Sequence, residues 1–291
     1  MSKEPPIIII GNPRSGTTLL RLMLTCHRNI VIPPECGFAV WWYKKYKDWD
    51  SDSIKARLND FLDDLFQSKK IELWNLNREQ LKEFILSKHI NNYSELVSSI
   101  YEYFAKNQKK TFHRWGDKNN YYLNHIDTIY SLFPGAQFIH IIRDGRDVAC
   151  SYKDMSKLNA ESKYAPNLPV DLITIAKEWV DNIQLIRSSF ASLGWSNVKE
   201  IRYEDLVMES DVILEDVCSF LNEEYDPSML AFHSINKIKQ LEPTELLAWK
   251  NKTLMEVTSS QMSRYKAELT ANEIELFNAF AGDLLAIYGY Q

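Results

Sequence analysis

The sequence feature that most constrains the fold is an eight-residue loop, Gly11–Thr18 (GNPRSGTT), which separates four consecutive isoleucines from a helix-forming segment. The isoleucine run Ile7–Ile10 is typical of a strand that is buried on both faces. After Gly16, apolar residues recur at helical spacing, at Leu19, Leu20, Met23 and Leu24. A strand, a glycine-containing loop and a helix in this order predict an anion site, because loop N–H groups and the helix dipole converge there.

The loop departs from the ATP-binding pattern at one position. Its spacing matches G-x-x-x-x-G-K-[ST], but Thr17 stands where the lysine belongs. That lysine contacts the β- and γ-phosphates of nucleoside triphosphates, so its absence disfavours a kinase or an ATPase. Arg14, inside the loop, offers a planar guanidinium suited to phosphate or sulfate oxygens. The alternative is that Gly11–Thr18 is only a tight turn between a strand and a helix.

Further strands and helices alternate along the chain. We expect strands at Asn29–Ile32, Thr111–Trp115, Gln137–Ile142 and Val198–Tyr203, and helices at Leu172–Phe190, Val212–Leu221 and Thr270–Tyr288. This alternation predicts an α/β, P-loop-like three-layer fold with a central, mostly parallel sheet. A ligand is expected beyond the carboxyl ends of the strands.

The chain reads as one domain, 1–291, with a helical insertion or cap at about 40–105. Apolar residues at helical spacing support the insertion, for example Ile54, Leu58 and Phe61. Within it, Trp41–Trp49 mixes aromatic residues with lysines. This stretch fits an amphipathic helix with its aromatics inward, or a wall that binds a hydroxyl acceptor.

Composition excludes several classes of protein. The net charge of -5 argues against nucleic acid as a partner, which would need a basic face. No stretch approaches twenty apolar residues, so we expect neither a membrane span nor a membrane partner, and a cytoplasmic location. The four cysteines and six histidines lack the spacings of a disulfide framework or a metal site. The oligomeric state is left open.

Two segments carry a family resemblance. Pro13–Leu24 (PRSGTTLLRLML) resembles the 5′-phosphosulfate loop of sulfotransferases that use 3′-phosphoadenosine 5′-phosphosulfate (PAPS). Phe138–Tyr152 (FIHIIRDGRDVACSY) is similar to their 3′-phosphate motif, in which an arginine and a serine eight residues later bind that phosphate. Glu35, shortly after the second strand, resembles the branch that contains tyrosylprotein sulfotransferases and bacterial relatives.

The resemblance implies a transferase that moves a sulfuryl group from PAPS to a hydroxyl group of a small molecule, saccharide or peptide. Glu35 would be the general base, and Arg14 with Lys118 would stabilise the leaving phosphate, without a metal ion. The implied donor-binding residues are Arg14, Ser15, Gly16, Thr17, Thr18, Arg143, Ser151, Tyr203 and Arg264.

Several of these residues have other readings. Glu35 could be the ribose-binding acid of a dinucleotide fold, although the G-x-G-x-x-G pattern is lacking. Lys118 could be a surface lysine that pairs with Asp117, and Arg143 could pair with Asp144 or Asp147.

Tyr203 fits either a neighbour of the adenine or phosphate groups or a core residue, and Arg264 is expected to approach the 3′-phosphate from a closing loop.

Two other function classes remain at this point. One is a P-loop kinase that acts on a nucleotide or sugar, and the other is a non-catalytic nucleotide-binding protein.

Overall fold

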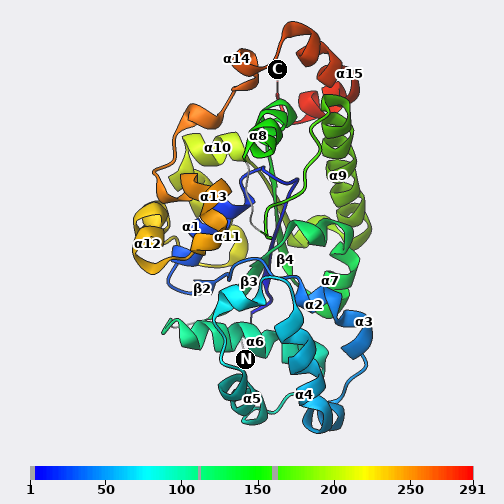
Figure 1. Ribbon diagram of the computed structural model, residues 1–291, viewed down its shortest axis with the longest axis vertical. Helices are drawn as coiled ribbons and strands as arrows, with labels where there is room; N and C mark the ends of the chain where they lie inside the picture. The colour runs from blue at the N-terminus through cyan, green and yellow to red at the C-terminus, as the bar shows by residue number, and fades with distance from the viewer. Residues whose placement is uncertain (1–3, 111–112, 159–162, 291) are drawn as a thin grey trace.

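A five-stranded parallel sheet forms the centre of the computed structural model, which describes residues 4–110, 113–158 and 163–290 (Figure 1). The strands are β1 (Ile7–Ile10), β2 (Ile30–Val31), β3 (Arg114–Lys118), β4 (Gln137–Ile142) and β5 (Val198–Arg202), in the spatial order β2-β3-β1-β4-β5. All four strand pairings are parallel. The predicted α/β fold with a mostly parallel sheet is confirmed, and β1 occupies its middle.

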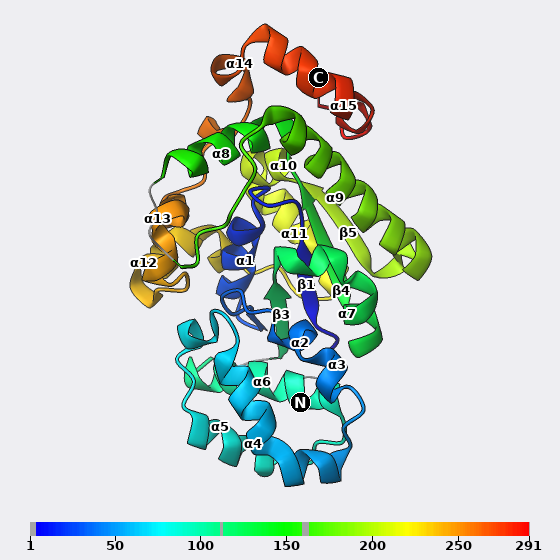
Figure 2. The ribbon, with the colours of Figure 1, turned by 45° about the vertical axis from the view of Figure 1, so that its right-hand side comes forward.

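Helices cover both faces of the sheet, and β1 shows why. Ile7 and Ile9 pack on one face among residues of α1 (Thr17–Cys26) and α11 (Ser210–Leu221). Ile8 and Ile10 pack on the other face with α6 (Tyr93–Asn107), α7 (Ile126–Leu132) and α9 (Leu172–Leu193). Figure 2 shows these helix layers on either side of the strands. Alternate side chains of a strand point to opposite faces, so both faces of β1 are apolar.

The segment between β2 and β3 is helical. It contains α2 (Phe38–Trp41), α3 (Tyr43–Tyr46), α4 (Ser51–Gln67) and α5 (Arg78–Leu86) before α6. Helices α4, α5 and α6 each begin after a side chain that caps a backbone N–H, from Asp50, Asn77 and Asn92 respectively. In Figures 1 and 2 these helices gather at the end of the molecule opposite α14 and α15.

The Trp41–Trp49 stretch divides its aromatic and basic residues as an amphipathic segment does. Tyr46 and Trp49 are buried, and Lys44, Lys45 and Lys47 are exposed. Trp41 is the exception, since 37% of its surface is exposed.

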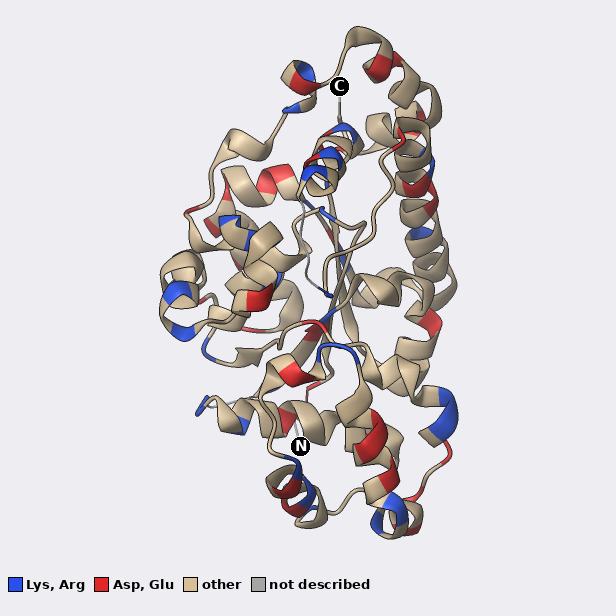
Figure 3. Ribbon diagram, in the orientation of Figure 1, with Lys and Arg blue, Asp and Glu red and all other residues tan. Residues whose placement is uncertain are grey.

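The remaining helices follow β4 and β5. They are α8 (Gly145–Lys157), α10 (Tyr203–Met208), α12 (Phe232–Lys239), α13 (Leu247–Lys250), α14 (Tyr265–Glu268) and α15 (Ala271–Ile287). In the part of the chain that the structure describes, no helix combines the length and apolarity needed to cross a bilayer. Figure 3 shows basic and acidic residues mixed along the helices. The cations of the site described below therefore differ from other lysines and arginines in their burial.

Three strands have boundaries that differ from the sequence prediction. β3 begins later than expected, at Arg114, and extends to Lys118, while Thr111 and Phe112 lie outside the described residues. The prediction missed the end of β3 because its last residues, Asp117 and Lys118, are polar, yet both are buried against specific partners. β2 is limited to Ile30–Val31, and β5 ends at Arg202, so Tyr203 opens α10 instead.

Candidate active site

The glycine loop joins the central strand β1 to the N-terminus of α1. Arg14 and Gly16 have φ angles of 69° and 95°, in the left-handed region that favours glycine. At Gly16 a side chain would also collide with Tyr203, whose ring lies 2.5 Å from the position of a Cβ atom. Asn12 fixes the loop to α9, because its side-chain oxygen accepts a hydrogen bond from Asn182 at 2.7 Å. This fixed backbone turn places the start of α1 at the carboxyl edge of the sheet.

The first cluster of site residues surrounds Arg143, directly after β4. Its guanidinium donates to the carbonyl of Arg14 at 3.0 Å and to that of Gln261 at 2.5 Å. It also lies over the ring of Tyr203, 4.7 Å from the centroid. Arg14 in turn donates to the hydroxyl of Ser151 at 3.1 Å. The structure therefore brings together four predicted donor-binding residues, Arg14, Arg143, Ser151 and Tyr203, from three separate parts of the sequence.

The carboxylates that were alternative partners for Arg143 have other contacts. Asp144 forms an ion pair with Arg146 at 2.8 Å and caps the start of α8. Asp147 accepts from the backbone N–H groups of Ser263 and Tyr265, at 2.7 and 3.1 Å, and so ties the late Ser263–Tyr265 segment to α8.

Two donors in this cluster lack partners within the described residues. The hydroxyl of Ser15 and Nε of Arg143 are buried, and neither makes a hydrogen bond there. Burial and the neighbouring Arg143 guanidinium lower the pKa of Arg14. Buried donors are usually satisfied, and two nearby guanidinium groups repel each other. The cluster thus has the chemistry of an anion site.

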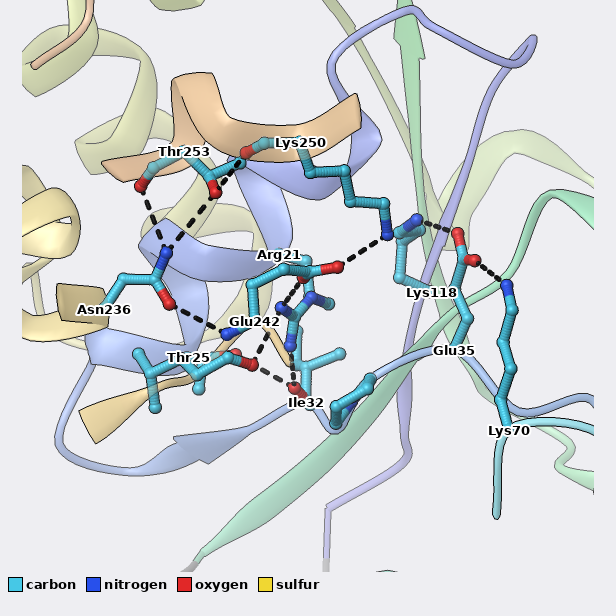
Figure 4. Close-up of polar contacts among 12 residues, drawn as sticks. Arg21, Thr25, Ile32, Glu35, Lys70, Lys118, Asn236, Glu242, Lys250 and Thr253 are labelled. Carbon is cyan, nitrogen blue, oxygen red and sulfur yellow. Dashed lines mark hydrogen bonds and ion pairs between the residues drawn. The ribbon is translucent and has the colours of Figure 1, made fainter. Parts of the chain in front are cut away.

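The second cluster joins Glu35 to two lysines (Figure 4). Lys118 is buried and forms an ion pair with Glu35, while Lys70 contacts the other carboxylate oxygen at 2.6 Å. Lys118 is paired with Ile9 in the sheet, two residues before the glycine loop. Asp117 points away, and accepts from the hydroxyls of Tyr101 and Tyr122 at 2.5 Å each. The alternative of a surface Lys118 that pairs with Asp117 is therefore wrong.

The charges around Glu35 determine its protonation. Burial alone would raise its pKa, but Lys118, with Lys250 and Lys70, lowers the pKa of Glu35 well below its usual range. Glu35 is accordingly a carboxylate at neutral pH. A carboxylate and an ammonium group lie in contact beside the glycine loop.

Other predicted residues occupy supporting positions. Thr17, in the first turn of α1, faces the side-chain oxygen of Asn120 at 3.5 Å, and Thr18 is half-buried beside it. Tyr203 supports Gly16 and Arg143, as described above. Arg264 forms ion pairs with Asp154 at 2.6 Å and Glu268 at 2.8 Å, so its charge is compensated within the protein.

Sequence reasoning missed four charged residues at the second cluster. Lys70 comes from the helical segment and contacts Glu35. Lys250, Glu242 and Arg21 form a second chain of ion pairs beside it. Of these four residues, only Arg21 could have been found from the sequence. It lies one turn after the loop among apolar helix residues, which indicates a buried arginine with a partner.

Comparison with known proteins identifies the family. The profile of the sulfotransferase family matches residues 5–227. The chain belongs to the sulfotransferase family. This finding confirms the resemblance carried by the two donor motifs, and with it the expectation of a transferase.

Individual relatives agree with this assignment. A protein-tyrosine sulfotransferase of Drosophila melanogaster is 22% identical over 294 residues, which cover 99% of this chain and 52% of that protein. The chain thus spans about half the length of this relative. The sulfotransferase domain of the Synechococcus PCC 7002 olefin synthase has a similar fold, with a TM-score of 0.58, 20% identity and 97% of each chain covered. A mouse sulfotransferase in complex with PAP (adenosine 3′,5′-bisphosphate) also has a similar fold, with a TM-score of 0.50 and 14% identity. The match covers 99% of this chain and 89% of the mouse chain.

Proposed function

We propose that this sulfotransferase moves a sulfuryl group from PAPS to a hydroxyl acceptor by direct in-line transfer. The observation that carries the proposal is the contact between Glu35 and Lys118 at the carboxyl edge of the sheet, next to the glycine loop. One group can accept the proton of the acceptor, and the other can stabilise the leaving oxygen. Family membership and the mouse neighbour's complex with PAP support the choice of donor.

The donor would lie across both clusters. The N–H groups of the glycine loop and the N-terminus of α1 bind the 5′-phosphosulfate. Arg143 and Ser151, which follow β4, bind the 3′-phosphate. The 3′-phosphate carries about two negative charges, and the 5′-phosphosulfate carries about two more, shared between its phosphate and its sulfate, so the donor can neutralise the clustered guanidinium groups of Arg14 and Arg143. The unpartnered Nε of Arg143 and hydroxyl of Ser15 are donors for these oxygens.

The reaction follows from this placement. The acceptor oxygen forms a bond to sulfur while the bond between sulfur and the bridging phosphate oxygen breaks. The acceptor proton passes to Glu35. Negative charge develops on the departing 5′-phosphate of adenosine 3′,5′-bisphosphate (PAP), where Lys118 stabilises it. The products are a sulfate ester and PAP.

An exposed aromatic surface beside Glu35 is the candidate acceptor contact. Trp41 packs against Gly37, two residues after Glu35, and its ring lies 6.1 Å from that of Tyr121, three residues after Lys118. Both rings are partly exposed, at 37% and 42%. Such faces bind planar or sugar-like hydroxyl compounds by stacking and apolar contact.

Ligand-induced thermal stabilisation tests the donor. A ligand at a hundred times its Kd stabilises by about 2.7 kcal/mol, which raises the Tm of a domain this size by about 5 °C. We expect this shift with PAP and a much smaller one with adenosine 5′-phosphate, which lacks the 3′-phosphate. A larger shift with ATP and Mg²⁺ than with PAP would overturn the proposal in favour of a kinase. Incubation with labelled PAPS and panels of phenols, saccharides and tyrosine peptides would then identify the acceptor.

A further inference from the structure

A second lysine reaches the candidate reaction centre from the C-terminal half of the chain. Lys250 ends α13, a short helix that lies over the glycine loop, since Arg14 donates to the carbonyl of Trp249 at 3.4 Å. In Figure 4 its ammonium group points toward Lys118 and Glu35, from the side opposite to Lys70. More than a hundred residues of chain separate Lys250 from Lys118, so the fold alone brings them together.

Lys250 is held in this orientation by a buried carboxylate. Its Nζ contacts Glu242 at 2.6 Å, and the other oxygen of Glu242 forms an ion pair with Arg21 of α1. Arg21 is itself fixed by the carbonyls of Ile32 and Leu241, at 3.0 and 3.1 Å. The side chains of Glu242 and Arg21 are each only 1% exposed. A charge with so buried an anchor has little freedom to turn toward solvent.

The charges of the combined cluster do not balance. Four cations, Arg21, Lys70, Lys118 and Lys250, accompany two carboxylates, Glu35 and Glu242. The net charge of the cluster is therefore about +2. Lys250 is also close enough to lower the pKa of both Glu35 and Lys118. Converging ammonium groups repel each other, and a lysine that served only to pair with Glu242 would not need to point toward Lys118 as well.

We propose that Lys250 is a second catalytic ammonium group, which contacts the transferring phosphosulfate together with Lys118, and that Glu242 and Arg21 are its positioning residues. This inference rests on the proposed sulfuryl transfer. Lys250 takes no part in proton transfer and donates hydrogen bonds to sulfuryl or bridging oxygens. The bond from sulfur to the bridging oxygen breaks, the bond to the acceptor forms, and the proton goes to Glu35 as before. Two ammonium groups share the charge that develops as the phosphate departs.

Steady-state kinetics of Lys250→Met test the proposal. Loss of one preorganised donor to a transition state costs about 100-fold in kcat. We expect a fall of that size, with the KM for PAPS and the Kd for PAP changed less than about tenfold. Lys237→Met, an exposed lysine on α12, is the matched control and should leave kcat unchanged. A Lys250→Met enzyme with wild-type kcat would overturn the proposal.

Two further variants separate catalysis from packing. Lys250→Gln keeps a hydrogen-bond donor near Glu242, so it should preserve the melting temperature and still lose kcat. If Lys250→Gln instead has the kcat of the wild type, the charge of Lys250 has no catalytic role and the proposal fails. Glu242→Gln should lower kcat, and should add little to the loss caused by Lys250→Met because both changes remove one interaction. Additive losses would show that Glu242 does not act through Lys250.

The same measurements distinguish this proposal from the reaction on which it rests. If the wild-type protein neither binds PAP nor consumes PAPS with any acceptor, the proposed function itself fails. If the wild type is active and the Lys250 variants retain its full activity, the proposed function stands and the proposed role of Lys250 is wrong.

Discussion

The most quantitative expectation concerns Asp117, the buried neighbour of Lys118. Burial raises the pKa of Asp117 from 3.8 to about 6, although the hydroxyls of Tyr101 and Tyr122 oppose the shift by donating to one carboxylate oxygen. The other oxygen has no hydrogen-bond partner within the described residues. Two pKa units correspond to about 3 kcal/mol of linkage between folding and protonation.

The sign follows from the higher pKa in the folded state. The folded protein binds the Asp117 proton more tightly than the unfolded chain does. Its contribution to stability is therefore full below about pH 4, near the unfolded pKa, and is lost as the pH rises through about 6. Asp117→Asn removes this titration while keeping a carbonyl that accepts from a tyrosine. Relative to Asp117→Asn, the wild type should lose about 3 kcal/mol of unfolding free energy between pH 4 and pH 7.5.

Urea unfolding of both proteins across this pH range measures the difference directly. The comparison cancels the titration of other carboxylates, because both proteins share them. Tyr101→Phe offers an internal check, since loss of one hydroxyl donor should raise the pKa of Asp117 further and steepen the dependence. A wild-type-minus-variant difference that stays constant within about 1 kcal/mol from pH 4 to pH 7.5 would refute the reasoning.

Four other outcomes are expected. Glu35→Gln should lower kcat by at least about 100-fold with little change in PAP affinity, as measured by turnover and thermal shift; retained turnover would mean that another group is the base. Gly16→Ala should destabilise the protein by about 1–3 kcal/mol in urea unfolding and weaken PAP binding, because φ is 95° and the Cβ atom meets the ring of Tyr203. Trp41→Ala should raise the KM of the acceptor and leave that of PAPS unchanged, and the reverse pattern would remove Trp41 from the acceptor site. Lys70→Met should raise the pKa of Glu35 and move the acid limb of the pH–kcat/KM profile to higher pH, whereas Lys70→Arg should not.

The donor half of the site was predictable because its residues belong to contiguous motifs. Gly11–Thr18 must follow a buried strand and open a helix, and local apolar patterns reveal both. Arg143 and Ser151 likewise follow the clearest strand of the sequence. Such positions lie in contiguous segments that can be compared with a known family, so the resemblance to sulfotransferases pointed to Arg143 and Ser151 and also to Glu35 and Lys118.

The second cluster, around Glu35, depends on tertiary contacts that leave no local pattern. Lys70 lies in a turn between helices, and Lys250 ends a four-residue helix. A lysine in either setting is usually solvated, and nothing nearby in the sequence indicates its partner. Glu242 is buried because Arg21, over two hundred residues earlier, neutralises it. The end of β3 was missed for a related reason, since its polar residues are buried by partners from distant elements.

The contact between Glu35 and Lys118 connects donor binding to the strength of the base. A carboxylate held by ammonium groups accepts a proton poorly, and Lys118 is the cation that most lowers the pKa of Glu35. In the proposed reaction, phosphate oxygens of the donor would compete for the same ammonium group, so Glu35 would gain basicity when Lys118 contacts the leaving phosphate. Lys70 contacts the opposite carboxylate oxygen and would keep Glu35 oriented during this exchange. We therefore expect the acceptor to be deprotonated only after the donor is in place, which couples proton removal to the presence of a sulfuryl group.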